Sequence, residues 1–173
     1  MKKIILTALL FSGLGFGQDG THNHHQEHGK KMEMNEHNHG VENTKFNKAL
    51  IKYEGLHQAF FDNNLAKIKS NAKEVLEELK NIQNEKINKT LIYTKKKLGE
   101  ISMSDDIKES KEAMNTVSQG MLVVLEKHAQ NKDYARFYCP MVKKYWIQNK
   151  TKIKKVMNPY ASSSMPHCGS IKQ

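Results

Sequence analysis

Apolar residues recur at steps of three and four through four consecutive segments, and this spacing constrains the fold more than any other feature. The segments cover roughly residues 44–60, 65–82, 87–101 and 107–128. A step of three or four residues returns a side chain to the same face of an α-helix, so each segment is expected to bury one stripe. Short polar stretches separate the segments, as between antiparallel helices. The sequence therefore predicts an all-α fold, an up-down bundle of about four helices.

The breaks between these segments contain residues that favour helix ends. The run Asp62-Asn63-Asn64 is typical of one helix stopping and the next beginning, and Asn84 occupies the same position before the third segment. Residues 102–106 resemble a helix cap, with two acidic residues where the helix dipole favours negative charge. We therefore expect helices to start directly after Asn64, Asn84 and Asp106.

The first 17 residues have the pattern of a secretory signal. Lys2 and Lys3 form a positive start, residues 4–11 are almost entirely apolar, and Gly15 and Gly17 are small residues suited to signal peptidase. We expect cleavage near Gly17 and a periplasmic or secreted protein. The apolar run is shorter than the roughly 20 residues needed to span a bilayer, so no transmembrane segment is expected.

Residues 18–42 form a polar segment that is rich in histidine. Too few apolar residues are present to offset the cost of ordering, so a disordered tail is expected, with a helical domain over residues 43–173. Neutral imidazoles bind Cu(II) and Zn(II), and the His-x-His and His-His spacings allow two rings to share one ion. The alternative is a solvated tail with incidental histidines. The candidate ligands are His22, His24, His25, His28, His37 and His39, six of the nine histidines in the chain.

Two short clusters near the C-terminus contain sulfur. The candidate ligands there are Cys139, Met141, Met165, His167 and Cys168. Thiolate and thioether donors select Cu(I), so the two clusters together predict a copper site. However, two cysteines in an exported protein pair by default, and closing a loop of about 30 residues would contribute roughly 3.5 kcal/mol. The residues alone leave both interpretations open, and a redox-dependent site could combine them.

Motifs in the same region carry a resemblance to a known family. They are Tyr138-Cys139-Pro140-Met141, Trp146, Asn158-Pro159-Tyr160 and Met165-Pro166-His167-Cys168-Gly169. With these residues the chain resembles the small exported domain of unknown function found in Bacteroidetes, alone or attached to CusB-type heavy-metal efflux adaptors. The resemblance covers roughly residues 45–171. It implies a helical periplasmic module that handles copper or a related metal, and it favours the metal site over the disulfide.

Composition narrows the remaining functional classes. The basic residues behind the net charge of +10 are almost all lysine, with Arg136 as the sole arginine. The planar guanidinium groups that bind phosphates and guanine edges with two hydrogen bonds are therefore nearly absent, and no nucleic-acid partner is expected. No nucleophile elbow, phosphate-binding glycine loop or catalytic carboxylate pair is present, which indicates a non-enzyme. His57 and His128 lie at apolar helix faces and are expected to be core or rim residues.

Together these features predict a periplasmic heavy-metal-binding protein, with copper as the expected ion, acting in sequestration or in delivery to efflux. Cu(I) is expected at the Cys/Met cluster, and Cu(II) or Zn(II) at the histidine-rich tail. A heavy-metal efflux adaptor is the expected protein partner. The alternative is a disulfide-stapled helical interaction module that docks on an efflux adaptor or another envelope protein, without metal at the cysteine pair.

Overall fold

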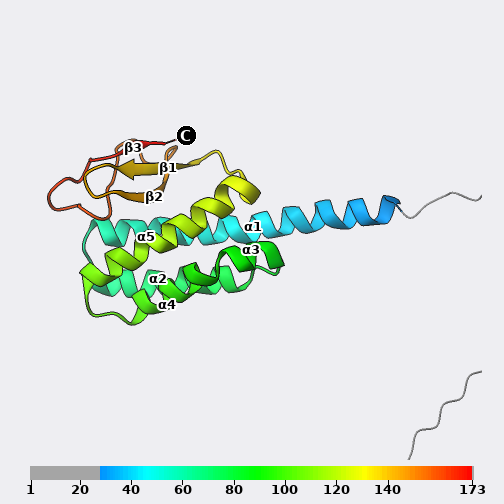
Figure 1. Cartoon of the computed structure of the whole chain (residues 1–173), viewed down its shortest axis with the longest axis horizontal. Helices are drawn as coiled ribbons and strands as arrows, with labels where there is room; N and C mark the ends of the chain where they lie inside the picture. The colour runs from blue at the N-terminus through cyan, green and yellow to red at the C-terminus, as the bar shows by residue number, and fades with distance from the viewer. Residues whose placement is uncertain (1–27, 173) are drawn as a thin grey trace, which may run out of the picture.

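The computed structural model describes residues 28–172, except for the side chains of residues 28–39 and 41. The predicted signal segment and residues 18–27 lie outside the described residues. Within this range, helices come first and strands last (Figure 1). The elements are α1 (His28–Phe61), α2 (Leu65–Lys80), α3 (Glu85–Thr90), α4 (Ile92–Met103), α5 (Ile107–Val124), the single π-helical turn η1 (Leu125–Ala129), β1 (Tyr134–Cys139), β2 (Lys144–Asn149) and β3 (Ser170–Ile171).

The helices pack around one apolar core, which confirms that the fold is mostly helical. Helix α1 lies against α2, α2 against α4, and α4 against α5. In Figure 1 the strands lie on one side of α1 and α5, while α2 and α4 lie on the other. The fully buried side chains follow the stripes predicted from sequence, and they include Phe46, Leu50, Leu56, Phe60, Ile68, Val75, Leu79, Leu98, Ile101, Met114, Val117 and Met121. Among the described residues, no helix is both long and apolar enough to cross a membrane.

The predicted helix starts are confirmed by three capping side chains. The Oδ1 atoms of Asn64 and Asn84 accept hydrogen bonds from the backbone N–H groups three residues ahead, at 3.0 and 3.1 Å. Asp106 accepts from the N–H of Lys108 at 2.7 Å. Each bond satisfies a donor that the first helical turn would otherwise leave without a partner. The predicted third helix is divided, because the backbone at Leu91 departs from helical geometry between α3 and α4.

The ordered domain begins before residue 43. Helix α1 starts at His28, inside the segment expected to be a disordered tail, and Glu42 is only 2% exposed. Its carboxylate accepts from the backbone N–H groups of Gln83 and Asn84 and pairs with Lys45 at 2.9 Å. Burial alone would raise the pKa of Glu42, but these bonds outweigh it and hold the pKa below its usual value. Glu42 therefore belongs to the fold, where it ties α1 to the start of α3.

The expectation of helices alone is wrong, because the C-terminal region forms a three-stranded antiparallel sheet. The strand order is β2-β1-β3, and Phe137 of β1 lies opposite Trp146 of β2. Successive side chains of a strand point to opposite faces. Tyr134 and Ile147 therefore join the helical core, while Phe137 and Trp146 are buried on the other face. The two hairpin strands bury side chains on both faces, so they lack the apolar-polar alternation that marks a half-exposed strand.

Candidate metal centre

The outer face of the sheet is covered by the segment that follows β2. Phe137, Cys139 and Trp146 are buried on this face, and Tyr160 and Cys168 pack against them. The Phe137 and Trp146 rings stack with their centroids 5.7 Å apart. The Trp146 and Tyr160 rings meet edge to face, with their centroids 6.3 Å apart. We call residues 150–169 the covering segment. It gives the sheet a second apolar interface, so that the sheet lies between the helices and the covering segment.

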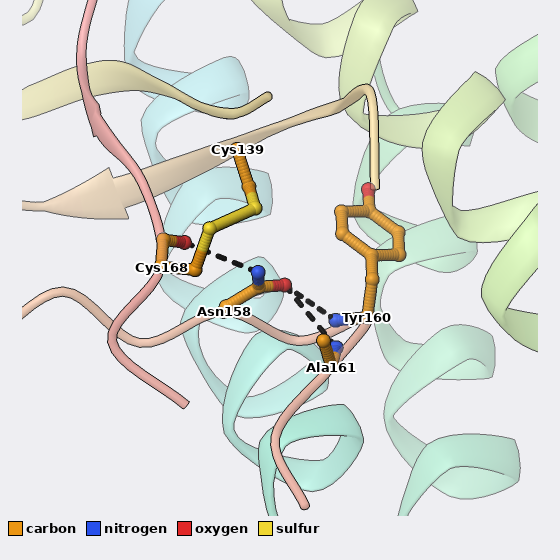
Figure 2. The surroundings of a disulfide bond; sticks show 5 residues. All are labelled: Cys139, Asn158, Tyr160, Ala161 and Cys168. Atoms are coloured by element: carbon orange, nitrogen blue, oxygen red, sulfur yellow. Dashed lines mark hydrogen bonds between the residues drawn. A yellow bond between two sulfur atoms is a disulfide. The ribbon is translucent and has the colours of Figure 1, made fainter. Parts of the chain in front are cut away.

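A disulfide joins the end of β1 to the end of the covering segment. Cys139 and Cys168 are bonded with a Cα–Cα distance of 5.6 Å, 29 residues apart in sequence (Figure 2). Cys139 is completely buried. Metal ligation requires a thiolate, and neither sulfur is one while they are bonded to each other. Of the two interpretations of the cysteine pair, the structure has the disulfide, and the Cu(I) site that the resemblance favours would require its reduction.

Asn158 holds the covering segment in its folded shape from the inside. Its Oδ1 atom accepts from the N–H groups of Tyr160 and Ala161, at 3.0 and 3.3 Å, and its Nδ2 atom donates to the carbonyl of Cys168 at 3.1 Å (Figure 2). Its backbone N–H donates to the carbonyl of Pro166 at 2.9 Å. The side chain is fully buried, so these bonds replace the water it loses. The Asn-Pro-Tyr motif therefore has a structural role beside the disulfide.

Two further side chains attach the covering segment to the rest of the domain. From β2, Gln148 accepts from the N–H of Met157 at 3.0 Å and donates to the carbonyl of Lys155 at 2.7 Å. From α1, the Nε2–H of His57 donates to the carbonyl of Met157 at 2.8 Å. His57 is 2% exposed, which confirms the expectation of a core histidine. These bonds fix the same short stretch of backbone from the sheet and from the helices.

Gly169 completes the Cys-Gly motif for a steric reason. Its φ angle is +144°, a conformation that residues with a Cβ rarely adopt. A Cβ built at this position would lie 2.5 Å from the rigid ring of Trp146. The chain therefore needs a glycine directly after Cys168 to bring β3 alongside β1.

The other predicted donors near the cysteines differ in exposure and in hydrogen bonding. Met141 is 69% exposed in the turn after β1, and Met165 is half-buried. His167 is exposed, and its Nδ1–H donates to the carbonyl of Val156 at 2.7 Å, which leaves Nε2 as its acceptor nitrogen. Among the side chains that the structure describes, no group of three or more His, Cys, Asp or Glu is positioned to hold a metal ion.

The histidine-rich segment lies at the edge of what the structure describes. His28, His37 and His39 belong to α1, but their side chains lie outside the described part of the chain. His22, His24 and His25 also lie outside the described residues. Three of the six positions of this candidate site are therefore on a helix that is continuous with the domain.

Glu54 is an anchoring residue that sequence reasoning missed. Its carboxylate accepts from the Tyr134 hydroxyl, from Asn149 at 2.9 Å and from Lys152 at 3.0 Å, which joins α1 to both long strands. Burial alone would raise the pKa of Glu54, but these bonds outweigh it and lower the pKa. Glu54 directly follows Tyr53 at the margin of the buried stripe. That position is a weak signal, because most acidic residues beside a stripe face solvent.

The chain matches no family model, no curated protein and no solved structure.

The buried His57 predicts a loss of stability between pH 6.5 and pH 4. Burial lowers the pKa of His57 to about 4 despite the Met157 bond and the charge of Glu54, so the unfolded chain binds a proton that the folded chain rejects. The free energy of unfolding should fall as pH drops from about 6.5, by about 2 kcal/mol at pH 5. Denaturant titrations of the native protein and of His57→Gln, whose amide can still donate to Met157, would measure it. Equal pH slopes in both proteins would contradict the assignment.

Proposed function

We propose that this protein is an exported heavy-metal-binding protein, with copper as its ion, whose histidine-rich N-terminal segment captures Cu(II) or Zn(II). The observation that carries the proposal is the concentration of six of the nine histidines between residues 22 and 39. Imidazoles at such spacing bind these ions in pairs. The disulfide supports an oxidising compartment, in keeping with export. We propose that the protein binds metal ions and does not catalyse a reaction.

The helical domain has a supporting role in this proposal. Helices α1, α2, α4 and α5 act as an up-down bundle that carries the histidine-rich segment at one end and the disulfide-closed module on one side. The similarity of the C-terminal motifs to the efflux-associated family supports sequestration, or delivery of the ion to an efflux adaptor. Nucleic acid is not among the partners we propose.

Reduction would create a second metal site in the same protein. Breaking the disulfide would free the thiols of Cys139 and Cys168, whose Cα atoms lie 5.6 Å apart. We propose that the reduced pair binds Cu(I), with Met141, Met165 or His167 as additional donors. Soft sulfur ligands favour Cu(I) over harder ions, which supports this assignment.

A second candidate function is favoured by the disulfide itself. In the bonded state Cys139 is fully buried and the covering segment is closed. This supports a stapled interaction module that docks on an efflux adaptor or another envelope protein without metal at the cysteine pair. The two candidates differ in whether the reduced protein binds Cu(I).

The histidine-rich segment should bind divalent metal without contributing to the fold. Replacing the six histidines at positions 22, 24, 25, 28, 37 and 39 with glutamine should abolish most Cu(II) and Zn(II) binding in calorimetry. The substitution preserves Glu42, which a deletion to residue 42 would remove from the core. Helical circular dichroism and the melting temperature should stay nearly unchanged. Unchanged metal stoichiometry in the variant would refute this site.

Cu(I) binding at the cysteine pair should depend on reduction. Protein isolated from the envelope under anaerobic conditions should contain no free thiol, and the reduced protein should compete for Cu(I) with a colorimetric chelator. Cys139→Ser and Cys168→Ser should each abolish tight binding, because one thiolate remains, and affinity should fall as pH drops. Met141→Leu should weaken Cu(I) binding with little loss of stability, whereas Met103→Leu, at an equally exposed position on α4, should leave binding unchanged. If the reduced native protein binds no Cu(I), the stapled interaction module is the correct function.

A further inference from the structure

Positive charge is concentrated in one part of the fold. Residues 132–172, which we call the basic module, contain nine Lys and Arg residues and a single acidic residue, Asp133. They account for +8 of the net charge of +10, so the remaining residues are nearly neutral. The same residues form the sheet and its covering segment, which Figure 1 shows as one layer on one side of the helices. The positive charge that is concentrated in residues 132–172 of the sequence therefore lies on one side of the fold.

Only part of this charge is used inside the domain. Arg136 pairs with Glu126, Lys144 with Glu112, and Lys152 with Glu54, so three cations are held by helix carboxylates. The other six are exposed, and they form no ion pair with a described carboxylate. They are Lys132, Lys143, Lys150, Lys154, Lys155 and Lys172.

These exposed lysines lie at the rim and on the outer layer of the basic module. Lys143 is in the turn between β1 and β2, and the backbone N–H of Lys172 donates to the carbonyl of Arg136 at the other edge of β1. Lys154 and Lys155 belong to the covering segment. Two large apolar side chains are exposed in the same module, Met141 at 69% and Ile171 at 52%.

We propose that the basic module binds the surface of anionic phospholipid membranes. The cations are almost all lysines, which attract diffuse negative charge but lack the rigid fork that recognises single carboxylates or phosphates. They are spread over a turn, a loop and a strand edge rather than gathered in a pocket. Spread lysines attract anionic lipid headgroups, and an adjacent exposed apolar side chain can enter the interface. The combination fits a lipid surface better than an acidic protein, which would require matched contacts.

The test is binding of the chain without residues 1–17 to vesicles of phosphatidylglycerol and phosphatidylcholine, measured by co-sedimentation with a metal chelator present. Wild-type protein should bind these vesicles and dissociate from them at high salt. It should not bind vesicles of phosphatidylcholine alone. Lys150→Glu, Lys154→Glu and Lys155→Glu combined should weaken binding on the order of 100-fold, since each lysine near the surface contributes roughly fivefold.

A matched control variant distinguishes binding by the basic module from an effect of the net charge of the whole protein. Lys73→Glu, Lys86→Glu and Lys96→Glu combined change the charge equally at exposed helical positions and should alter binding less than twofold. Met141→Ser should weaken binding roughly three- to tenfold, whereas Met103→Ser, equally exposed on α4, should not. Circular dichroism of each variant checks that the fold is retained.

Three results would overturn the proposal. One is equal weakening by the two triple variants, which would assign binding to net charge alone. Another is equal binding to vesicles with and without phosphatidylglycerol. The third is binding to polyglutamate with no binding to anionic vesicles, which would identify an acidic protein as the partner.

Discussion

The burial of Trp146 by the covering segment is the contact on which the C-terminal sheet region of the structure depends. A sheet with two six-residue strands and one two-residue strand has little area of its own, and its outer face would expose Phe137 and Trp146 to water. The covering segment removes that apolar surface from solvent, which is the main favourable term in folding. The disulfide and Asn158 hold the segment in the closed shape, and His57 and Gln148 fix it to the helices and the sheet.

The C-terminal motifs therefore have structural roles in the oxidised protein. Cys139 and Cys168 close the segment, Asn158 bonds its backbone, and Gly169 makes room for the ring of Trp146. The histidine-rich segment lies outside the covering segment and its disulfide, whereas the basic module contains both. Capture of Cu(II) or Zn(II) and membrane attachment, as we propose them, would then use different parts of the chain, whereas the Cu(I) site of the reduced protein would lie within the basic module.

The helical part of this architecture could be predicted from sequence, because helix formation depends on local patterns. Apolar spacing located the buried stripes, and Asn64, Asn84 and Asp106 marked the helix starts. The strands were missed because both of their faces are buried, which hides the alternation of a half-exposed strand. The partners of Glu54 and Asn158 depend on chain segments meeting in space, and no local pattern specifies those meetings. The same holds for the cysteines, whose residue types fit a metal site or a disulfide equally well.

The most direct test of this account is amide hydrogen exchange in a variant without the disulfide, Cys139→Ala and Cys168→Ala combined. If the covering segment holds the sheet on the helices, the amides of β1 and β2 should exchange at least about tenfold faster in the variant, while those of α2 and α4 stay protected. Unchanged exchange in the strands, or equal acceleration in helices and strands, would contradict the claim that the disulfide-closed segment specifically secures the sheet.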